Sequence, residues 1–246
     1  MKILMHLSFL GTNYCGYQIQ PNGITVQQRL NEATRALFGY DCESVGCSRT
    51  DSGVHALEYY CTLDVPENAP KIPVDRVPSA LNVRLPESIT VYEAKEVGSD
   101  FHARYSVKKK TYEYVIDNGY QRDPFLFGRA WHIKTPLDAD KMNEAAKSFI
   151  GKHDFSAFMA SGSEIEDATR TVFDAEVERV GERVLFRVTA DGFLYNMVRI
   201  MMGTLADVSC GRIEAGEIGR IIELCERKNA GVTAPADGLY LKHVEY

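Results

Sequence analysis

The segment 47–56 places one carboxylate, Asp51, where it could do chemistry. Arg49 precedes Asp51 by two residues, and a Ser-Gly pair, which favours a turn, follows it directly. An apolar run over residues 59–65 comes after that turn. We therefore expect Asp51 on a sharp loop at the mouth of a sheet, where its side chain can meet a substrate. The same spacing also occurs in solvated loop charges and turn-capping acids, so the rest of the chain has to decide.

A carboxylate that acts as a nucleophile or stabilises charge has to stay ionised in a partly dry cleft. Burial raises the pKa of a carboxyl group, whereas a nearby cation lowers it. Arg49 is close in sequence, but strand alternation can point it away from Asp51. Arg199 stands in the apolar segment 196–208, where burying a guanidinium is costly without an acidic partner. We favour a pairing of Arg199 with Asp51; an Arg199 that faces water at the edge of a helix is the alternative.

Aromatic and basic residues stand together in the middle of the chain. Tyr112 and Tyr114 are two residues apart, which places them on the same face of a strand, and Lys108–Lys110 precede them. Rings next to cations can stack on unpaired bases and attract phosphates. The window 100–134 carries a net charge of +3, whereas the whole chain carries −6. A packed sheet face and a solubilising strand end remain the alternatives.

Other kinds of site find little support. The six histidines lie singly, without a metal-binding spacing to each other or to cysteine. Neither a dinucleotide-binding glycine pattern nor a phosphate loop is present, so we expect neither a metal nor a cofactor. A nucleophilic Cys47 assisted by His55 is conceivable, but Cys47 ends an apolar strand and is better interpreted as a buried, inert thiol.

Composition indicates an ordinary globular chain. Its 246 residues are 45% hydrophobic and 25% charged, enough for one large or two small domains. No apolar run reaches transmembrane length, and the N-terminus enters strand-like alternation at once, so we expect neither a membrane span nor a signal peptide. The six cysteines show no paired spacing and indicate reduced thiols of a cytoplasmic protein.

The elements that must position these residues alternate between strands and helices. In the first half, Thr25 with Gln28 forms a capping box, and Gly39 ends the helix that follows. In the second half, Gly181-Glu182 joins two strands in a hairpin. Expected strands cover residues 3–9, 42–47, 59–65, 89–97, 111–117, 129–133, 172–180, 183–191 and 238–245; expected helices cover 26–38, 74–83, 138–150, 196–208 and 216–226.

This order predicts an α+β fold with a mainly antiparallel sheet and helices packed on it. The two halves follow a similar plan. We place the boundary in the connection 101–106 and expect residues 1–103 to carry the Asp51 loop and residues 104–246 to carry Tyr112 and the Arg199 helix.

Several blocks, in order along the whole chain, are similar to one known family. They cover residues 11–18, 20–23, 25–27, 49–56, 100–104, 110–114, 153–158, 192–199 and 234–241. The chain thereby resembles the TruA family of tRNA pseudouridine synthases. It departs from the family pattern without losing the acid, the tyrosine or the helix arginine. Leu10 stands for aspartate, Tyr17 for tryptophan, Cys47 and Ser48 for Ala-Gly, and Ser52 for alanine.

The resemblance implies the pseudouridine synthase fold, with the catalytic cleft between the two halves. It implies isomerisation of uridine to pseudouridine in the anticodon stem-loop of tRNA, at positions 38, 39 and 40, without a cofactor. The target nucleotide has to be flipped out of the stem, at an expense of a few kcal/mol. It also implies a homodimer, in which one subunit holds the tRNA body while the other modifies the anticodon arm.

Roles follow from the resemblance residue by residue. Asp51 is expected to be the essential carboxylate, Arg49 to flip or hold the nucleotide, and Arg199 to keep Asp51 ionised. Tyr112 is expected to stack on the uracil ring, and as a base it would need a cation to lower its pKa. The remaining expected substrate-binding residues are His102, Arg104, Lys108, Lys109 and Lys110.

Two alternatives from other functional classes remain open at this point. One is a module that binds tRNA on the same fold without chemistry. The other is a hydrolase that uses Cys47 and His55.

Overall fold

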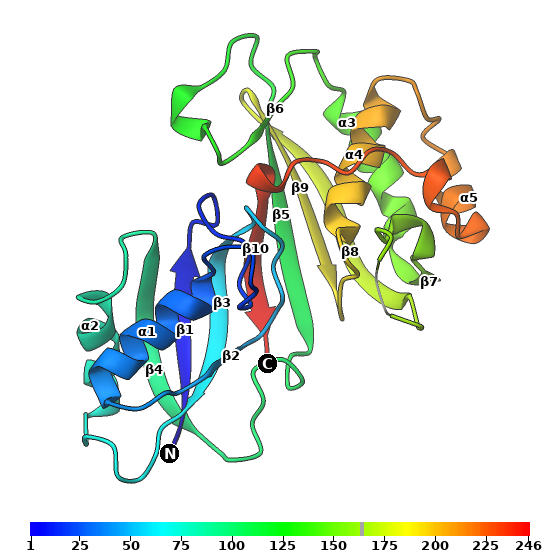
Figure 1. Cartoon of the computed structure of the whole chain (residues 1–246). Helices are drawn as coiled ribbons and strands as arrows, with labels where there is room; N and C mark the ends of the chain where they lie inside the picture. Colours follow the sequence, from blue (N-terminus) through cyan, green and yellow to red (C-terminus); the bar gives the residue numbers. More distant parts are fainter. Residues whose placement is uncertain (163–164) are drawn as a thin grey trace. The chain divides into compact units, whose positions relative to one another are not determined.

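The alternation of apolar residues at the N-terminus produces β1 (Lys2–Phe9) in the computed structural model of the chain, which describes residues 1–162 and 165–246. Ile3, Met5 and Leu7 are fully buried, as their spacing predicts. β1 pairs antiparallel with a strand on each side. The sheet of this part of the chain has the order β4 (Ile89–Val97), β1, β3 (His55–Asp64), and β2 (Ser44–Gly46) also pairs with β3 (Figure 1).

The helix α1 (Val26–Phe38) crosses in front of this sheet in Figure 1. The hydroxyl of Thr25 accepts a hydrogen bond from the backbone N–H of Gln28 at 3.2 Å, and Gly39 ends the helix with a φ of 75°. The N-cap and the stop are therefore confirmed, whereas the capping box is only half formed, because the Gln28 side chain donates to Glu32 at 3.0 Å instead of returning to Thr25. The shorter elements η1 (Val74–Arg76) and α2 (Val77–Asn82) follow and lead toward β4.

The chain divides into two compact units. Unit 1 comprises residues 1–108 and 241–246, and unit 2 comprises residues 109–240. The last strand, β10 (Leu239–Glu245), thus contributes residues to both units. Within unit 1 the tail is held by side chains, since the N–H of Val244 donates to Glu58 at 3.2 Å and the hydroxyl of Tyr246 donates to the carbonyl of Ala103 at 2.8 Å.

In unit 2 the strands again pair mainly antiparallel. The predicted hairpin is confirmed: Gly181 takes a φ of 60° between its two strands. The order is β5 (Lys109–Asp117), β9 (Arg183–Ala190), β8 (Thr169–Val180), β7 (Gly151–Asp154), and β6 (Trp131–His132) pairs parallel with β5.

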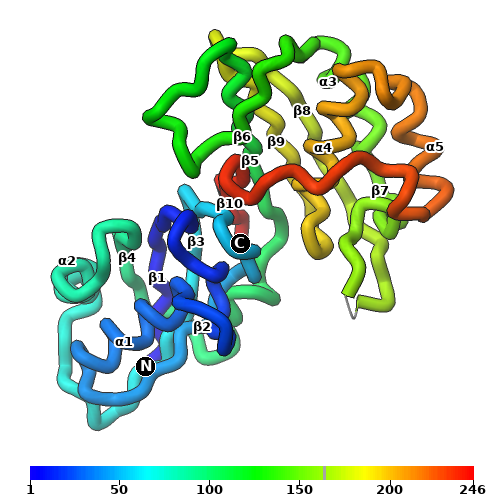
Figure 2. The backbone as a smooth tube through the Cα atoms, turned by 45° about the horizontal axis from the view of Figure 1, so that its top comes forward, coloured from blue at the N-terminus to red at the C-terminus, as the bar shows by residue number. Residues whose placement is uncertain are grey.

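The helices α3 (Ala139–Ala146) and α4 (Met197–Ser209) pack on each other and against these strands, and α5 (Glu217–Leu224) lies near β7 (Figures 1 and 2). Between them, the rings of Phe149, Phe158 and Phe186 form part of a fully buried core. Short 3-10 turns complete the unit: η2 (Pro124–Leu126), η3 (Lys147–Phe149), η4 (Ser156–Phe158), η5 (Arg227–Asn229) and η6 (Ala236–Gly238).

The α+β class with mainly antiparallel pairing is confirmed, whereas several boundaries differ from those predicted. β3 begins at His55 rather than at residue 59, because Ala56 already pairs with Phe9. The predicted helix 138–150 is α-helical only to Ala146 and tightens into a 3-10 turn. The strand β7 was not predicted, because its four residues are no more than half-buried and carry little apolar signal. In the described ranges, no helix combines the length and hydropathy needed to cross a bilayer.

Candidate active site

The Asp51 loop is held by hydrogen bonds to the backbone of the loop 11–17, far away in sequence. The N–H of Gly11 donates to Nδ1 of His55 at 2.9 Å, and the N–H of Gly53 donates to the carbonyl of Tyr14 at 3.1 Å. A longer bond joins the N–H of Tyr17 to the carbonyl of Thr50 at 3.4 Å. The bonded residues precede and follow Asp51 in the chain. Hydrogen bonds between the two loops therefore fix the position of Asp51.

Two glycines allow this close approach. A Cβ on Gly11 would lie 1.9 Å from the carbonyl oxygen of Val54, and a Cβ on Gly16 would lie 2.3 Å from that of Thr50. Gly16 also has a φ of +77°, which L side chains rarely adopt. The predicted turn after Asp51 is present as well, with Gly53 at a φ of 85°. The glycines of both blocks therefore serve to position the carboxylate.

Asp51 itself is half-buried and lies in the connection between β2 and β3. Its carbonyl oxygen accepts the N–H of Val54 at 3.1 Å, which closes the turn. The neighbouring hydroxyl of Thr50 is buried without a hydrogen-bond partner, the one such side-chain atom in the described part of the chain. An unmet hydroxyl destabilises the folded state by about 1–3 kcal/mol, and loops that carry such strain are often functional.

Buried tyrosines support the chain just before Asp51. The hydroxyl of Tyr59 donates to the carbonyl of Ser48 at 2.5 Å, and the rings of Tyr17 and Tyr59 stack with centroids 4.5 Å apart. Burial raises the pKa of both tyrosines well above the ordinary value, so their hydroxyls remain donors at any physiological pH. Tyr17, one of the departures from the family pattern, is thus a structural residue.

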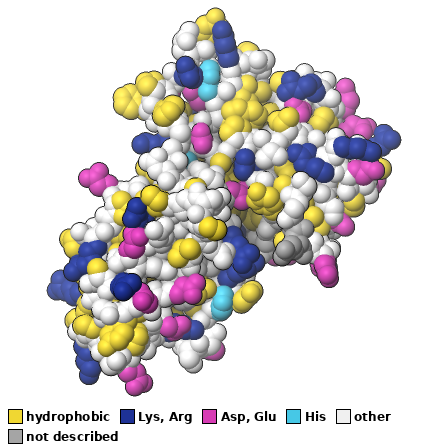
Figure 3. All heavy atoms as spheres, viewed as in Figure 1, with side chains coloured by type: hydrophobic (Ala, Val, Ile, Leu, Met, Phe, Trp, Pro, Cys, Tyr) yellow, Lys and Arg dark blue, Asp and Glu magenta, His cyan; other side chains and the backbone are white. Residues whose placement is uncertain are grey.

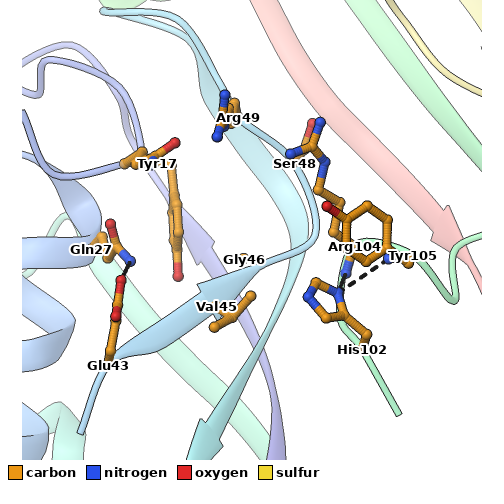
Figure 4. A pocket seen from close by; sticks show the side chains of 11 residues that line it. Tyr17, Gln27, Glu43, Val45, Gly46, Ser48, Arg49, His102, Arg104 and Tyr105 are labelled. Atoms are coloured by element: carbon orange, nitrogen blue, oxygen red, sulfur yellow. Dashed lines mark hydrogen bonds between the residues drawn. The ribbon is translucent and has the colours of Figure 1, made fainter. Parts of the chain in front are cut away.

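Three predicted site residues, Arg49, His102 and Arg104, line one pocket of about 200 Å³ in unit 1 (Figure 4). Arg49 and Arg104 are exposed, and His102 is half-buried. Tyr105, which was not predicted, also lines the pocket: its ring lies 4.3 Å from that of His102 and 5.7 Å from the guanidinium of Arg104. An aromatic residue directly after Arg104 was the signal that could have identified it. Figure 3 shows Lys and Arg side chains grouped beside a histidine on the face that it draws.

Cys47 and His55, the pair of the hydrolase alternative, both lie in the core. Each is fully buried. The sulfur of Cys47 accepts the N–H of Tyr60 at 3.4 Å, and Nδ1 of His55 accepts the N–H of Gly11. Both side chains therefore stabilise the Asp51 loop and its strand, as the interpretation of Cys47 as a buried thiol predicts.

Arg199 lies in the first turn of α4, in unit 2, and is half-buried. Its Nε donates to the carbonyl of Ala234 at 2.7 Å, and its Nη1 donates to the side chain of Asn196 at 2.6 Å. Asn196 caps the helix in the left-handed conformation, with a φ of 61°. The guanidinium is therefore held by defined acceptors rather than left in water at the helix edge.

Tyr112 and Tyr114 share a face of β5, as predicted, but their surroundings differ. Tyr114 is fully buried and donates its hydroxyl to the carbonyl of Pro235 at 2.7 Å; burial raises its pKa strongly, and the nearby Arg199 opposes that rise. Tyr112 is 6% exposed, and its ring meets Phe193 edge to face at 5.0 Å. Tyr114 is thus a core residue, and Tyr112 is the better candidate for contact with a substrate.

The three lysines differ in their surroundings. Lys108 belongs to unit 1 and donates its Nζ to the carbonyl of Tyr246 at 2.9 Å. Lys109 belongs to unit 2 and stands over the ring of Phe173 at 5.1 Å, whereas Lys110 is half-buried on the next position of β5. Within the described residues, no group of three or more His, Cys, Asp or Glu side chains has an arrangement suited to a metal ion.

Comparison with known proteins agrees with the resemblance seen in the sequence. A family model described as tRNA pseudouridine synthase matches residues 5–106 and 145–246. The tRNA pseudouridine synthase A of Thermoanaerobacter sp. (strain X514) is 44% identical over 100% of this chain and 99% of its own length. This chain belongs to the tRNA pseudouridine synthase family. The family's enzyme from Acetivibrio thermocellus, also tRNA pseudouridine synthase A, is 46% identical over the same shares.

The two matched segments of the tRNA pseudouridine synthase model fall in the two halves of the chain, which confirms the expected α+β fold of two similar halves. Asp51 and Arg199 lie inside these segments, and Tyr112 lies between them. A Cbf5–Nop10–Gar1 complex of known crystal structure matches with a TM-score of 0.37 and 14% identity, over 83% of this chain and 44% of that chain, which is too remote to add to the family relationship.

Proposed function

We propose that this pseudouridine synthase converts uridine to pseudouridine in the anticodon stem-loop of tRNA, at positions 38, 39 and 40, with Asp51 as the essential carboxylate. The observation that supports the proposal most directly is the hydrogen bonding and close packing of the Asp51 loop against the loop 11–17, where Gly11 and Gly16 allow the approach. A carboxylate held this way is preorganised for a reaction that needs one acid in a fixed place.

The reaction itself is an isomerisation that uses only side chains. The bond between N1 of uracil and C1′ of the ribose breaks, the detached base turns within the site, and C5 bonds to C1′. The hydrogen on C5 leaves as a proton and N1 gains one, so the atoms balance without a cofactor. Release of tritium from tRNA labelled with [5-³H]uridine therefore measures the reaction directly. Tritium release by the parent supports the proposal, and binding of tRNA without release would make the chain a binding module.

Arg199 is proposed to keep Asp51 ionised. A guanidinium has five N–H donors in a fixed plane, and the bonds to Ala234 and Asn196 hold that plane in place. Replacing Arg199 by Met removes the cation, so we expect the pKa of Asp51 to rise and the acidic limb of the pH–rate profile to move to higher pH. The measurement is tritium release at saturating tRNA between pH 5 and 9. An unmoved acidic limb would contradict this role.

Tyr112 is proposed to stack on the uracil ring. We expect Tyr112→Leu to lower kcat/KM by about 10- to 100-fold, because a stacking contact with a base contributes about 1–3 kcal/mol. Tyr112→Phe keeps the ring, so its effect isolates the hydroxyl and any part that it has in removing the C5 proton. Tritium release under single-turnover conditions compares the two variants.

A matched control separates stacking from packing, since Tyr112 also contacts Phe193. Phe186→Leu removes a fully buried ring from the neighbouring strand β9, so it should lower the melting temperature without changing tritium release per folded molecule. Parent-like kinetics for both Tyr112 variants would leave Tyr112 as a core residue only.

The remaining substrate contacts are proposed for phosphates. Arg104, Lys108, Lys109 and Lys110 are proposed for this role, and Lys108 would exchange its bond to the carbonyl of Tyr246 for one to a phosphate. Neutralising one phosphate-binding cation should reduce the steepness with which tRNA affinity falls with salt by about one contact. An unchanged salt slope in Lys110→Gln would remove Lys110 from the set.

We also propose that the protein works as a homodimer in the cytoplasm. The loop around η2 supports an association surface, because Phe125 is 83% and Phe127 is 84% exposed within the apolar run 124–127. Light scattering should then give about twice the chain mass of 27.6 kDa, and Phe127→Ser should shift the population toward 27.6 kDa. A parent mass of one chain would contradict the homodimer.

A further inference from the structure

The pocket lined by Arg49 has features that the reaction at Asp51 does not use. Its walls come from three separate segments of unit 1: the end of the loop 11–17 with α1, the strand β2 with the residues after it, and the connection 102–105 (Figure 4). Asp51 is not among its lining residues. At about 200 Å³, it is smaller than the sites of drug-sized ligands and suits a single small planar group.

His102 provides a hydrogen-bond donor of known orientation. Its Nδ1 accepts the backbone N–H of Arg104 at 3.1 Å and that of Tyr105 at 3.3 Å. A ring nitrogen that accepts two N–H groups carries no proton, so the proton of the neutral ring lies on Nε2. In Figure 4 this second nitrogen faces the pocket. The ring therefore presents one N–H donor to whatever the pocket holds.

The strand β2 provides a second polar edge. β2 pairs only with β3 in unit 1, and the N–H of Cys47 bonds to Tyr60. Alternation along an antiparallel strand then turns the N–H and C=O of Gly46 away from β3, as it does for Ser44, whose N–H and C=O bond to Asn31 and Gln27. Since Gly46 lines the pocket, it offers an adjacent donor and acceptor there.

Stacking and charge complete the site. Tyr105 is 77% exposed, which is unusual for a ring already in contact with His102 and Arg104. Arg49 and Arg104 place two guanidinium groups on the lining, against a single carboxylate, Glu43, which contacts Gln27 at 3.4 Å. An aromatic ring, a backbone donor–acceptor pair and an excess of cations together match one unpaired nucleotide of RNA.

We propose that this pocket holds the nucleotide next to the target uridine, with its base against Tyr105, its edge on Gly46 and His102, and its phosphate on Arg49 and Arg104. The inference rests on the proposed function. Its geometric support is the short path along the chain: Arg49 and Asp51 are two residues apart, so their Cα atoms are at most about 7 Å apart. This separation allows a nucleotide bound at Arg49 to be the neighbour of the one at Asp51.

A double-mutant cycle, in which Tyr105 of the protein and one base of the RNA are changed singly and together, tests this contact through the dissociation constant. The protein carries Asp51→Asn, which stops turnover, and the RNA is tRNA in which the base on the 5′ or the 3′ side of the target uridine is removed. We expect one of the two abasic tRNAs to bind about tenfold more weakly than intact tRNA. When Tyr105→Leu is added to the protein, the same abasic change should alter the dissociation constant less than about twofold, because the stacking partner is gone.

Two further variants sharpen the result. Tyr92→Leu replaces another exposed tyrosine of unit 1 that does not line the pocket, so the tenfold loss on base removal should persist. His102→Asn keeps an acceptor for the two N–H groups but removes the Nε2 donor, and it should weaken binding of intact tRNA with an unchanged melting temperature. Equal losses with and without Tyr105, or no loss with either abasic tRNA, would overturn the proposal.

These measurements distinguish a failure of the proposed function from a failure of the proposed nucleotide pocket. Loss of tritium release by the parent enzyme, with the Tyr105-dependent abasic effect intact, would overturn the proposed function and leave the nucleotide pocket. Normal tritium release with additive effects in the cycle would remove the pocket alone.

Discussion

Asp51→Asn is expected to lower tritium release from [5-³H]uridine-labelled tRNA by at least about 10³-fold, while the dissociation constant for tRNA changes less than about threefold. The amide is nearly the same size as the carboxylate, so the loop strapped by Gly11 and Gly16 should keep its shape. What is lost is the negative charge and the nucleophilic or basic oxygen that the chemistry requires. Single-turnover release and equilibrium binding, measured on the same preparation, give both numbers.

Asp41→Asn is the matched control for this experiment. Asp41 lies in unit 1 outside the Asp51 loop, and its ion pair with Arg35 at 3.2 Å is highly exposed on both sides. Exposed pairs contribute little to stability, so the variant should behave like the parent in release and in melting. If Asp51→Asn retained more than a tenth of parental release, Asp51 could not be the essential carboxylate.

Gly16→Ala is expected to lower turnover by about 100-fold while the protein remains folded. Its new Cβ would lie 2.3 Å from the carbonyl oxygen of Thr50, the residue before Asp51, and backbone cannot yield as a flexible side chain can. The Asp51 loop therefore has to move, and a misplacement of about 1 Å at a catalytic group can reduce a rate by about 10². Tritium release, together with a thermal melt, measures the effect.

Gly39→Ala isolates the part of this effect that comes from backbone strain. Gly39 has nearly the same φ, +75°, but nothing lies within 4 Å of its added Cβ. We expect it to destabilise the fold by about 1 kcal/mol, as an alanine at positive φ does, and to leave turnover unchanged. Equal losses of turnover in the two variants would show that the contact with Thr50 is not what positions Asp51.

Local patterns predicted the elements that position the site. The capping Thr25 with Gly39 predicted α1, the alternation from Ile3 predicted β1, and Gly181 predicted the hairpin of β8 and β9. These predictions succeed because caps, alternation and tight turns are decided by residues within a few positions of one another. The short strand β7 lacks such a pattern, and its existence depends on pairing with β8.

The site also has some features that adjacent residues predicted and others that depend on residues far apart in the chain. The block 49–56 identified Asp51 and its turn from a few adjacent residues. It did not indicate that Gly11 and Gly16 hold this loop, because their contacts span about 40 residues of chain. Nor did it indicate Tyr105, whose value lies in facing a pocket shared with Arg49 and β2.

The sequence by itself determined the chemistry available to this protein: one carboxylate on a turn, a helix arginine, a strand tyrosine and family-specific blocks around them. Only the tertiary structure decided which cations gather at one pocket, which tyrosines are structural, and that Lys108 is bound to the tail while Lys109 lies on Phe173. The physical reason is the distance along the chain over which each effect acts. Side-chain type and backbone propensity act locally, whereas burial and hydrogen bonding between distant loops exist only after the strands between them have paired.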